Sequence, residues 1–129
     1  MPETEFRPYI AMSRLVHSPD MPSWPHLVMS VAAPHLRPTD IAARYGGEEF
    51  LIGLPHTDAE QAFAIMDRIR QDFSQIRHPF GDQHFLSTTS GGIATYPLYQ
   101  DGDSLIKAAD EALYQAKRHG RNRIHTNED

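Results

Sequence analysis

The clearest hydrophobic pattern in the chain lies between residues 57 and 76. Apolar residues recur there on one face at helical spacing, namely Ala62, Met66, Ile69, Phe73 and Ile76. Thr57 and Glu60 have the spacing of a capping box, in which each side chain satisfies a backbone N–H at the start of a helix. The pattern predicts an amphipathic helix from Thr57 to Ile76, with Phe63, Met66 and Phe73 as packing residues rather than a cofactor site.

A second amphipathic pattern runs from about Asp103 to His119. Its apolar stripe consists of Leu105, Ala109, Ala112, Leu113 and Ala116. Gly120 follows directly, and glycine is the residue that most readily adopts the left-handed conformation that ends many helices. We therefore expect a second helix that ends at Gly120 and carries Lys117 in its last turn.

β-prone runs separate and flank these two helices. Residues 41–54 (IAARYGGEEFLIGL) contain two such runs around Gly46 and Gly47, which is a strong hairpin signal. Residues 84–96 also resemble a strand, in which Gly91 and Gly92 predict a bulge or a close approach of another backbone. Two shorter strands are expected at Tyr9–Val16 and Asn122–His125.

One further helix is expected nearer the N-terminus. Residues 25–36 could form it, with Ser23 as its cap and Pro25 in its first turn, although Pro34 would strain its end. Together these elements predict an α+β fold, in which helices pack on a mixed sheet.

Composition limits the classes of protein that are possible. A chain of 129 residues, 40% hydrophobic and 22% charged, predicts one globular domain. The absence of cysteine excludes a disulfide scaffold, a thiolate zinc site and a cysteine nucleophile. No apolar run approaches the roughly 18 residues of a membrane span, and the N-terminus does not resemble a signal peptide. We expect a soluble, unexported, cytoplasmic chain without a membrane segment.

Charge argues against a nucleic-acid partner. Twelve Lys and Arg residues stand against 17 Asp and Glu, a formal net charge of −5, so a broad electrostatic grip on a nucleic-acid backbone is not expected. A local basic cluster nevertheless comprises Lys117, Arg118, Arg121 and Arg123. On charge alone it resembles a solvated helix end, where cations favour the negative pole of the helix dipole.

Three segments carry a family resemblance. RYGGEEF at 44–50 resembles the signature hairpin of GGDEF domains, the diguanylate cyclases. SGGIATYP at 90–97 resembles the family's SxGIAxYP strand, and ADEALYQAKRHGRNRI at 109–124 resembles its terminal helix and strand. The chain is accordingly identified as a single GGDEF-type domain over 1–129, with a clear match at 37–124 and an atypical part at 1–36. The resemblance implies a central, mostly antiparallel sheet flanked by helices. This is the nucleotidyl-cyclase or palm-like fold, which is ferredoxin-like in its topology.

The resemblance also implies a chemistry. Diguanylate cyclases join two GTP molecules into cyclic di-GMP, with Mg²⁺ or Mn²⁺ neutralising charge on the phosphates. The resemblance assigns Glu48 and Glu49 to catalysis and to the metal. It assigns substrate binding to Gly46, Gly47, Lys117 and Arg121. Lys117 and Arg121 are expected to lie one helical turn apart and to bind the phosphates.

A product-binding motif is implied just upstream of the hairpin. Arg37-Pro-Thr-Asp40 has the family's RxxD pattern, with five residues between Asp40 and Gly46. An arginine can donate to N7 and O6 of guanine, and a carboxylate can accept from the N–H groups of the base. Arg68, on the outer face of the first clear helix, resembles the arginine that completes this inhibitory site. Without its fixed offset from the hairpin, the motif would be read as a surface ion pair.

The first third of the chain departs from the family pattern. The family's DxLTGLxNR-like turn is absent, as are its DxDxFK strand with the first metal-binding Asp and the Asn and GD residues that recognise guanine. If residues 9–15 form the first strand, Ser13 falls near the metal Asp position, where a hydroxyl is a poor substitute. Either the domain is degenerate, or the beginning of this chain is not the family's native one.

Three functions are compatible with these residues. The chain could be an active cyclase that works as a dimer, a module that binds cyclic di-GMP, or a structural remnant that does neither. The residues favour binding of cyclic di-GMP at Arg37, Asp40 and Arg68, with weak or no synthesis from GTP. A homodimer is expected when ligand is bound.

Overall fold

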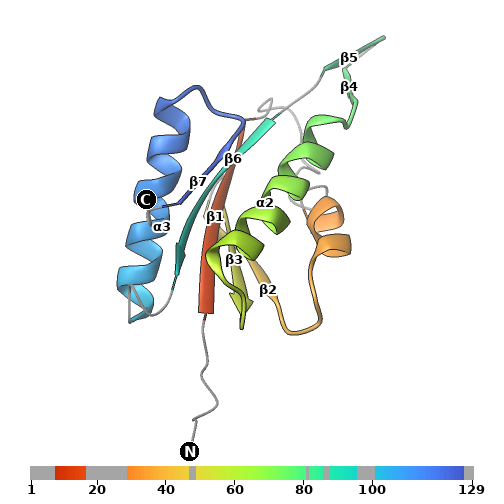
Figure 1. The fold of residues 1–129 in the computed structure, drawn as a ribbon. Helices are drawn as coiled ribbons and strands as arrows, with labels where there is room; N and C mark the ends of the chain where they lie inside the picture. Colours follow the sequence, from red (N-terminus) through yellow and green to blue (C-terminus); the bar gives the residue numbers. More distant parts are fainter. Residues whose placement is uncertain are drawn as a thin grey trace, which may run out of the picture.

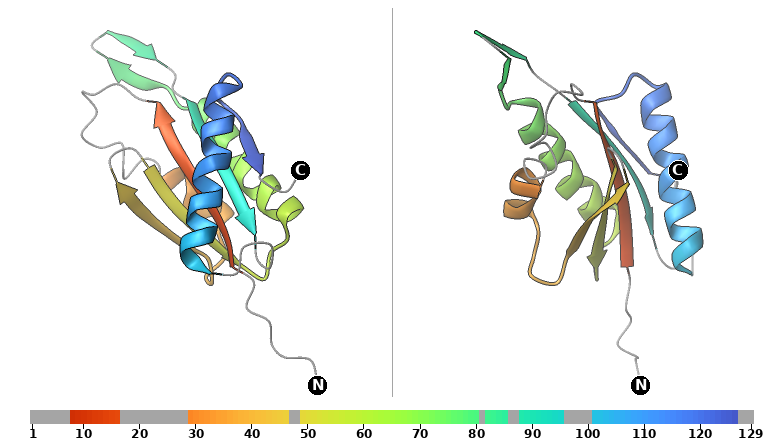
Figure 2. Two further views of the ribbon diagram at one scale, coloured as in Figure 1. Left: turned by 90° about the vertical axis from the view of Figure 1, so that its left-hand side faces the viewer. Right: turned by 180° about the vertical axis from the view of Figure 1, so that it is seen from behind.

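The computed structural model describes residues 8–16, 29–46, 49–80, 82–85, 88–95 and 101–126. They form a five-stranded sheet in the order β2-β3-β1-β6-β7, with a helix on each face (Figures 1 and 2). A separate two-stranded sheet, β4-β5, extends away from this body at the upper right of Figure 1. No helix in these described ranges is long and apolar enough to cross a membrane.

The elements follow one another along the chain from red to blue in Figure 1. Residues 29–32 are helical and run into the 3-10 turn η1. The bounds are β1 Pro8–Val16, η1 Ala33–His35, β2 Ile41–Gly46, β3 Glu49–Pro55, α2 Ala59–Ser74, β4 His78–Phe80, β5 Gln83–Phe85, β6 Thr88–Thr95, α3 Gly102–Arg118 and β7 Ile124–Thr126.

Strand β1 forms the middle of the sheet. It pairs antiparallel with β3 on one side and with β6 on the other, whereas β6 and β7 are parallel. The expected α+β fold with a mostly antiparallel sheet is therefore confirmed, and so is the strand expected at Tyr9–Val16.

Helix α2 covers one face of the sheet. Its buried residues are Ala62, Met66, Ile69 and Phe73, and the first three pack with Ile52, Leu54, Ile93 and Ile124 of the strands. The predicted helix and its inner face are thus confirmed. Three details differ. Phe63, expected to pack, is 41% exposed, and the cap is Asp58 with Gln61 rather than Thr57 with Glu60. The helix also ends at Ser74, so Ile76, expected on its inner face, lies beyond it and is only partly buried. The Asp58 side chain accepts from the Gln61 N–H, and the Gln61 side chain accepts from the Asp58 N–H.

Helix α3 covers the opposite face. Its residues Leu105, Ala108, Ala109 and Leu113 form a second core cluster with Ala94 of β6. The small residues let the helix approach β6 so closely that a β-carbon on Gly92 would lie 2.1 Å from the Ala109 carbonyl oxygen. The close backbone approach expected at the Gly91-Gly92 pair is therefore confirmed.

Several predicted boundaries are corrected. The single strand expected at 84–96 is divided: β5 pairs with β4, and β6 begins at Thr88. Strand β7 begins at Ile124, because Asn122 has a positive φ of 48° and belongs to the preceding turn. Of the helix expected at 25–36, residues 29–32 are helical and Pro34 lies in η1, whereas Ser23 and residues 25–28 are outside the described residues.

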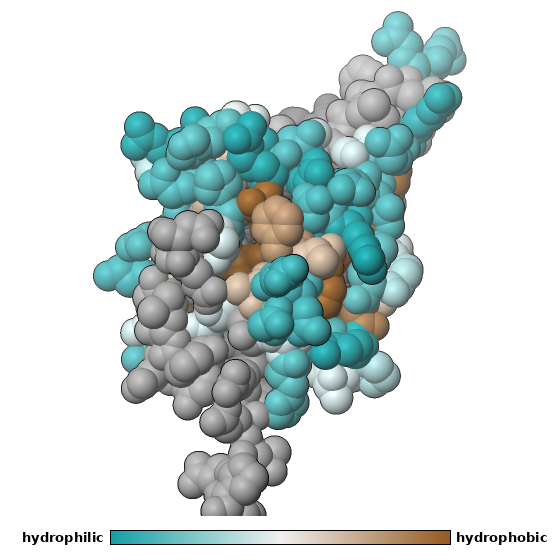
Figure 3. All heavy atoms as spheres, in the orientation of Figure 1, coloured by the Kyte–Doolittle hydropathy of each residue, from teal (hydrophilic) through white to brown (hydrophobic). Residues whose placement is uncertain are grey.

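Figure 3 shows one face of the molecule in the orientation of Figure 1. Hydrophilic side chains cover most of the described surface on this side. A hydrophobic area lies near the centre of the view, between the positions of the two helices, where the layers of the core meet.

Candidate functional site

The glycine-rich hairpin joins β2 to β3. Strand β2 ends at Gly46 and β3 begins at Glu49, and these two residues are opposite each other in the antiparallel register. Glu49 is partly exposed. Gly47 and Glu48, which the sequence predicts for substrate and metal binding, lie outside the described residues.

The sheet register places the hairpin near the start of β7. Glu49 lies opposite Arg14 of β1, and Arg14 lies opposite Ser90 of β6. Neighbouring strands are about 4.8 Å apart, so the backbones of Glu49 and Ser90 are separated by roughly 10 Å. Ser13 lies one register position away, opposite Phe50 and Gly91, and Gly91 in turn pairs with Ile124.

The basic residues after α3 reach the same end of the sheet. The backbone N–H of Asn122 donates to Ser90 Oγ over 2.9 Å, and the N–H of Gly91 donates to the Arg123 carbonyl over 3.0 Å. Arg121 is exposed, and Lys117 is partly buried in the last turn of α3. The hairpin and the expected phosphate-binding residues therefore share one end of the sheet.

The sequence predicted that Lys117 and Arg121 lie one turn apart on the same helix. In the structure only Lys117 is helical, so the two residues do not share a helical face. The helix ends at Arg118, and Gly120 has a φ of 115°. The Gly120 N–H donates to Lys117 O and the Arg121 N–H to Ala116 O, which is the Schellman pattern of a helix C-terminus. The predicted terminator Gly120 is confirmed, and its turn carries Arg121 beyond the helix.

The described residues do not provide a complete metal site. A hard divalent cation takes about six oxygen ligands. Among the residues the structure describes, no three His, Asp or Glu side chains gather, and Glu49 is the only member of the expected carboxylate pair that can be placed. These donors alone do not fit a resident Mg²⁺ or Mn²⁺.

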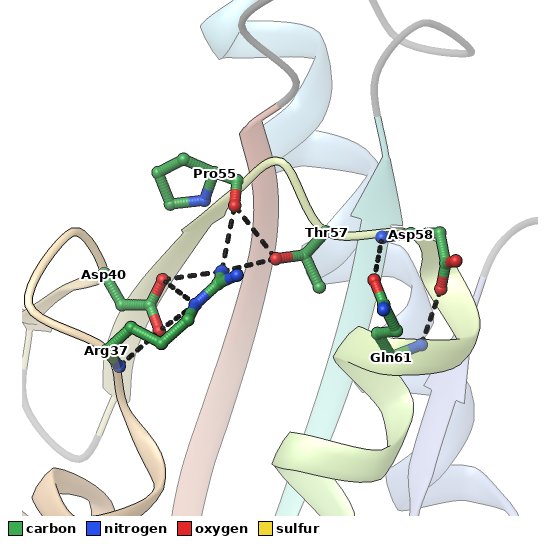
Figure 4. Close-up of polar contacts among 6 residues, drawn as sticks. All are labelled: Arg37, Asp40, Pro55, Thr57, Asp58 and Gln61. Carbon is green, nitrogen blue, oxygen red and sulfur yellow. Dashed lines mark hydrogen bonds and ion pairs between the residues drawn. The ribbon is translucent and has the colours of Figure 1, made fainter.

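Arg37 is held by three residues at once, Asp40, Pro55 and Thr57 (Figure 4). Its Nη2 lies 2.8 Å from Asp40 Oδ1, and its Nε donates to both Asp40 oxygens over 3.2 Å. Nη2 also donates to the Pro55 carbonyl over 2.9 Å and to Thr57 Oγ1. The Thr57 hydroxyl, which the sequence assigned to the helix cap, instead donates to Pro55 O over 3.0 Å. The guanidinium is thereby fixed to the connection between β3 and α2.

The two members of the RxxD motif differ in exposure. The Asp40 side chain is 0% exposed, whereas that of Arg37 is 45% exposed. The hydrogen bond to Asp40 and the charge of that carboxylate raise the pKa of Arg37 above its ordinary value. Asp40 therefore orients Arg37, and Nη1 is the guanidinium nitrogen without an acceptor among the described residues.

A surface pocket adjoins Arg37. It has a volume of about 260 Å³ and is lined by Arg37, Thr57, Gln61, Ala64 and Ile65. Arg68 is exposed and lies one helical turn beyond Ala64 and Ile65 on the same face of α2. We call these six residues the Arg37 surface. The sequence did not predict Thr57 or Gln61 here, because their spacing from Asp40 is meaningful only once α2 is placed.

Comparisons with known proteins agree on the family. The family model described as diguanylate cyclase, GGDEF domain, matches residues 28–123. Diguanylate cyclase A of Treponema denticola is 38% identical over 89 residues, which are 68% of this chain and 24% of that protein. A diguanylate cyclase of Vibrio cholerae is 38% identical over 99 residues, 75% of this chain and 29% of that protein. The chain thus spans less than a third of these two curated relatives.

Solved structures share the fold. The GGDEF domain of DgcB from Caulobacter crescentus, crystallised in complex with c-di-GMP, has a TM-score of 0.84 and 29% identity over 96% of this chain and 80% of that chain. The active GGEEF domain of a diguanylate cyclase from Vibrio cholerae has a TM-score of 0.82 and 25% identity over 95% of this chain and 84% of that chain. With the family model matching most of its length, the chain belongs to the GGDEF domain family of diguanylate cyclases.

Proposed function

We propose that this domain binds cyclic di-GMP at the Arg37 surface and that its synthesis of cyclic di-GMP from GTP is slow or absent. The observation that carries the proposal is the fixed Arg37 guanidinium. It is half exposed, held by a buried carboxylate and placed at the edge of a pocket. An arginine used only as a surface ion pair would need neither the buried partner nor the carbonyl and hydroxyl acceptors behind it.

The chemistry of this surface suits a guanine dinucleotide. O6 and N7 of guanine are acceptors, and the Nη1 group of Arg37 retains donors for such atoms. Ala64 and Ile65 offer an apolar wall to a base, and the exposed Arg68 offers a positive charge to a phosphate. Asp40 acts through Arg37 as a positioning residue. The c-di-GMP complex of the DgcB domain, a relative of the same fold, supports this ligand.

An active cyclase is the second candidate function. Residues 46–50 spell GGEEF, the same five letters that name the active GGEEF domain of the Vibrio cholerae diguanylate cyclase. In such a reaction Lys117 and Arg121 would hold the triphosphate, and two copies of the domain would each present one GTP. Ser13, at the position where the family resemblance places a metal-binding Asp, weighs against robust turnover, because a hydroxyl is a poor substitute for a carboxylate ligand.

Calorimetric titration tests the proposal. Wild-type protein should bind cyclic di-GMP, and Arg37→Ala should weaken binding by about 1–3 kcal/mol, because one guanine contact is lost. Arg77→Ala is the matched control, since Arg77 is an exposed arginine beyond the end of α2 and outside the pocket. Equal affinity of wild type and Arg37→Ala would overturn the site. A separate titration with GTP and Mg²⁺ distinguishes a cyclase-type site from a product site.

A further inference from the structure

Three consecutive residues after α3 have a positive φ. The values are 115° for Gly120, 62° for Arg121 and 48° for Asn122. Glycine adopts this region freely, and Asn tolerates it, but an arginine does so only where surrounding contacts hold it there. The contacts of residues 120–122 therefore show which parts of the protein hold this left-handed backbone conformation in place.

Asn122 is fixed from two sides. Its side-chain Oδ1 accepts a hydrogen bond from Arg70 Nη1 of α2 over 2.9 Å, and its backbone N–H donates to Ser90 Oγ of β6 over 2.9 Å. Arg70 is itself oriented by Asp67, one turn earlier in α2, through a 2.7 Å contact between Nε and Oδ1. Helix α2 and strand β6 thus hold the connection between α3 and β7.

Arg121 has a fixed backbone and an available side chain. Its N–H donates to Ala116 O over 2.9 Å, and its carbonyl accepts from Arg123 Nε over 3.2 Å. The side chain is exposed, and no described residue accepts a hydrogen bond or forms an ion pair with its guanidinium. Arg70 and Arg123 donate hydrogen bonds within the protein, and Arg118 lies over the Tyr114 ring, so among the described arginines of this region Arg121 is the one left available to a ligand.

We infer that Arg70 and Asn122 are positioning residues for a polyphosphate site, where they hold the turn that presents Arg121. The inference rests on the proposal that Arg121 binds the phosphates of a nucleoside triphosphate. It adds the residues that hold Arg121 in position. An arginine on a flexible segment would lose backbone as well as side-chain entropy when a phosphate bound, whereas a backbone that is already fixed avoids the backbone part of that penalty.

Binding of inorganic tripolyphosphate, and of GTP with Mg²⁺, to the whole chain tests the inference by calorimetry. Arg70→Met keeps the unbranched stem of the side chain and removes its guanidinium donors, so affinity should fall on the order of 3- to 10-fold, the effect of one lost hydrogen bond. Arg70→Lys, which keeps a donor and the charge, should retain most of the affinity. Arg77→Met removes an exposed arginine away from Asn122 and should bind as wild type does.

Asn122→Gly separates backbone conformation from side-chain pairing. Glycine adopts a positive φ and leaves Arg70 only its long 3.4 Å bond to the backbone carbonyl of residue 122, so affinity should fall nearly as far as in Arg70→Met. The double variant should be no weaker than Arg70→Met alone. Hydrogen exchange of the Arg121 and Asn122 amides should accelerate in Arg70→Met, while the amides at the centre of β1 are unchanged.

Several results would overturn the inference. They are wild-type affinity for tripolyphosphate in Arg70→Met, wild-type affinity in Arg121→Ala, and no binding of tripolyphosphate by the wild type. A cyclic di-GMP titration of the same samples separates this question from the proposed function. Loss of binding there, with the tripolyphosphate results intact, would count against the Arg37 surface and leave the positioning role standing.

Discussion

Gly92 of β6 and Ala109 of α3 are in backbone contact. A β-carbon added to Gly92 would lie 2.1 Å from the Ala109 carbonyl oxygen and 2.2 Å from the Leu113 nitrogen. Both obstructing atoms belong to a helix backbone, so no change of side-chain rotamer can relieve the overlap. Helix α3 would have to move away from the sheet as a whole.

We therefore expect Gly92→Ala to destabilise the fold by about 3 kcal/mol or more, at the upper end of overpacking effects. Gly53→Ala in β3 is the matched control, because no atom lies within 4 Å of the added carbon. Urea denaturation of both variants measures the difference in the free energy of unfolding. Equal midpoints for the two variants would mean that α3 does not pack on β6 as described.

The second prediction concerns the role of Asp40. Since its carboxylate is covered and bonded to Arg37, Asp40→Asn should weaken cyclic di-GMP binding by about 1–3 kcal/mol through the loss of a charge-assisted partner. In an Arg37→Ala background the same change should have little further effect, because Asp40 acts through Arg37. Additive losses in the double variant would show instead that Asp40 touches the ligand directly, as its motif alone suggested.

The third prediction concerns pH. The backbone N–H and the hydroxyl of Ser104 donate to Asp101 over 2.8 and 3.0 Å at the start of α3, and these bonds lower the pKa of Asp101 below its ordinary value. A lowered pKa means that the stabilisation is complete above the unfolded-state pKa, near 4, and is lost as pH falls through the lower folded-state pKa. Thermal melts between pH 5 and 2.5 should show a smaller acid-induced loss in Asp101→Asn than in wild type, because Asn still caps but does not titrate. Parallel melting curves of the two proteins would contradict this.

The fourth prediction concerns catalysis. Phosphoryl transfer of this kind depends on carboxylates that bind the metal ions, which neutralise charge on the phosphates. Ser13 lies in β1, which pairs with β3, and it neighbours Arg14, the residue opposite Glu49. A product assay with GTP and Mg²⁺ at high protein concentration should detect little or no cyclic di-GMP from the wild type. Ser13→Asp should raise the signal if that position is the missing ligand, whereas Ser13→Asn is its uncharged control. Robust synthesis by the wild type would refute the expectation of weak activity.

Local patterns were sufficient where one signal dominated. The alanine and leucine stripe of α3 together with Gly120 predicted a helix, its buried face and its terminator, and all three are confirmed. The N-terminus of α2 was ambiguous by comparison. Thr57 with Glu60 and Asp58 with Gln61 both satisfy the spacing of a capping box, and the choice is made by a tertiary contact, since Arg37 occupies the Thr57 hydroxyl.

The site was predictable only as a set of residue types. The motif named Arg37 and Asp40, which the structure pairs, but its letters could not show that Asp40 is buried and Arg37 half exposed, because that depends on the chain around Pro55. The spacing of Lys117 and Arg121 suggested one helical face, and the left-handed turn at Gly120 breaks that periodicity. Asn122 was wrongly assigned to the last strand because the sequence pattern did not show that the left-handed turn continues through it. The signal that could have corrected this is the Gly-Arg-Asn order after a helix, since Asn tolerates positive φ.

The central position of β1 has a consequence for the order in which the domain assembles. Strand β1 pairs with β3 and with β6, so its partners are separated from it by dozens of residues and are synthesised after it. Long-range pairing of this kind slows folding, and β1 stays unpaired until β3 and β6 have been synthesised. A chain truncated to residues 28–123, the stretch that the family model matches, would retain both helices and the signature hairpin. It would nevertheless lack the strand that joins the two halves of the sheet, and the facing edges of β3 and β6 would be open to aggregation.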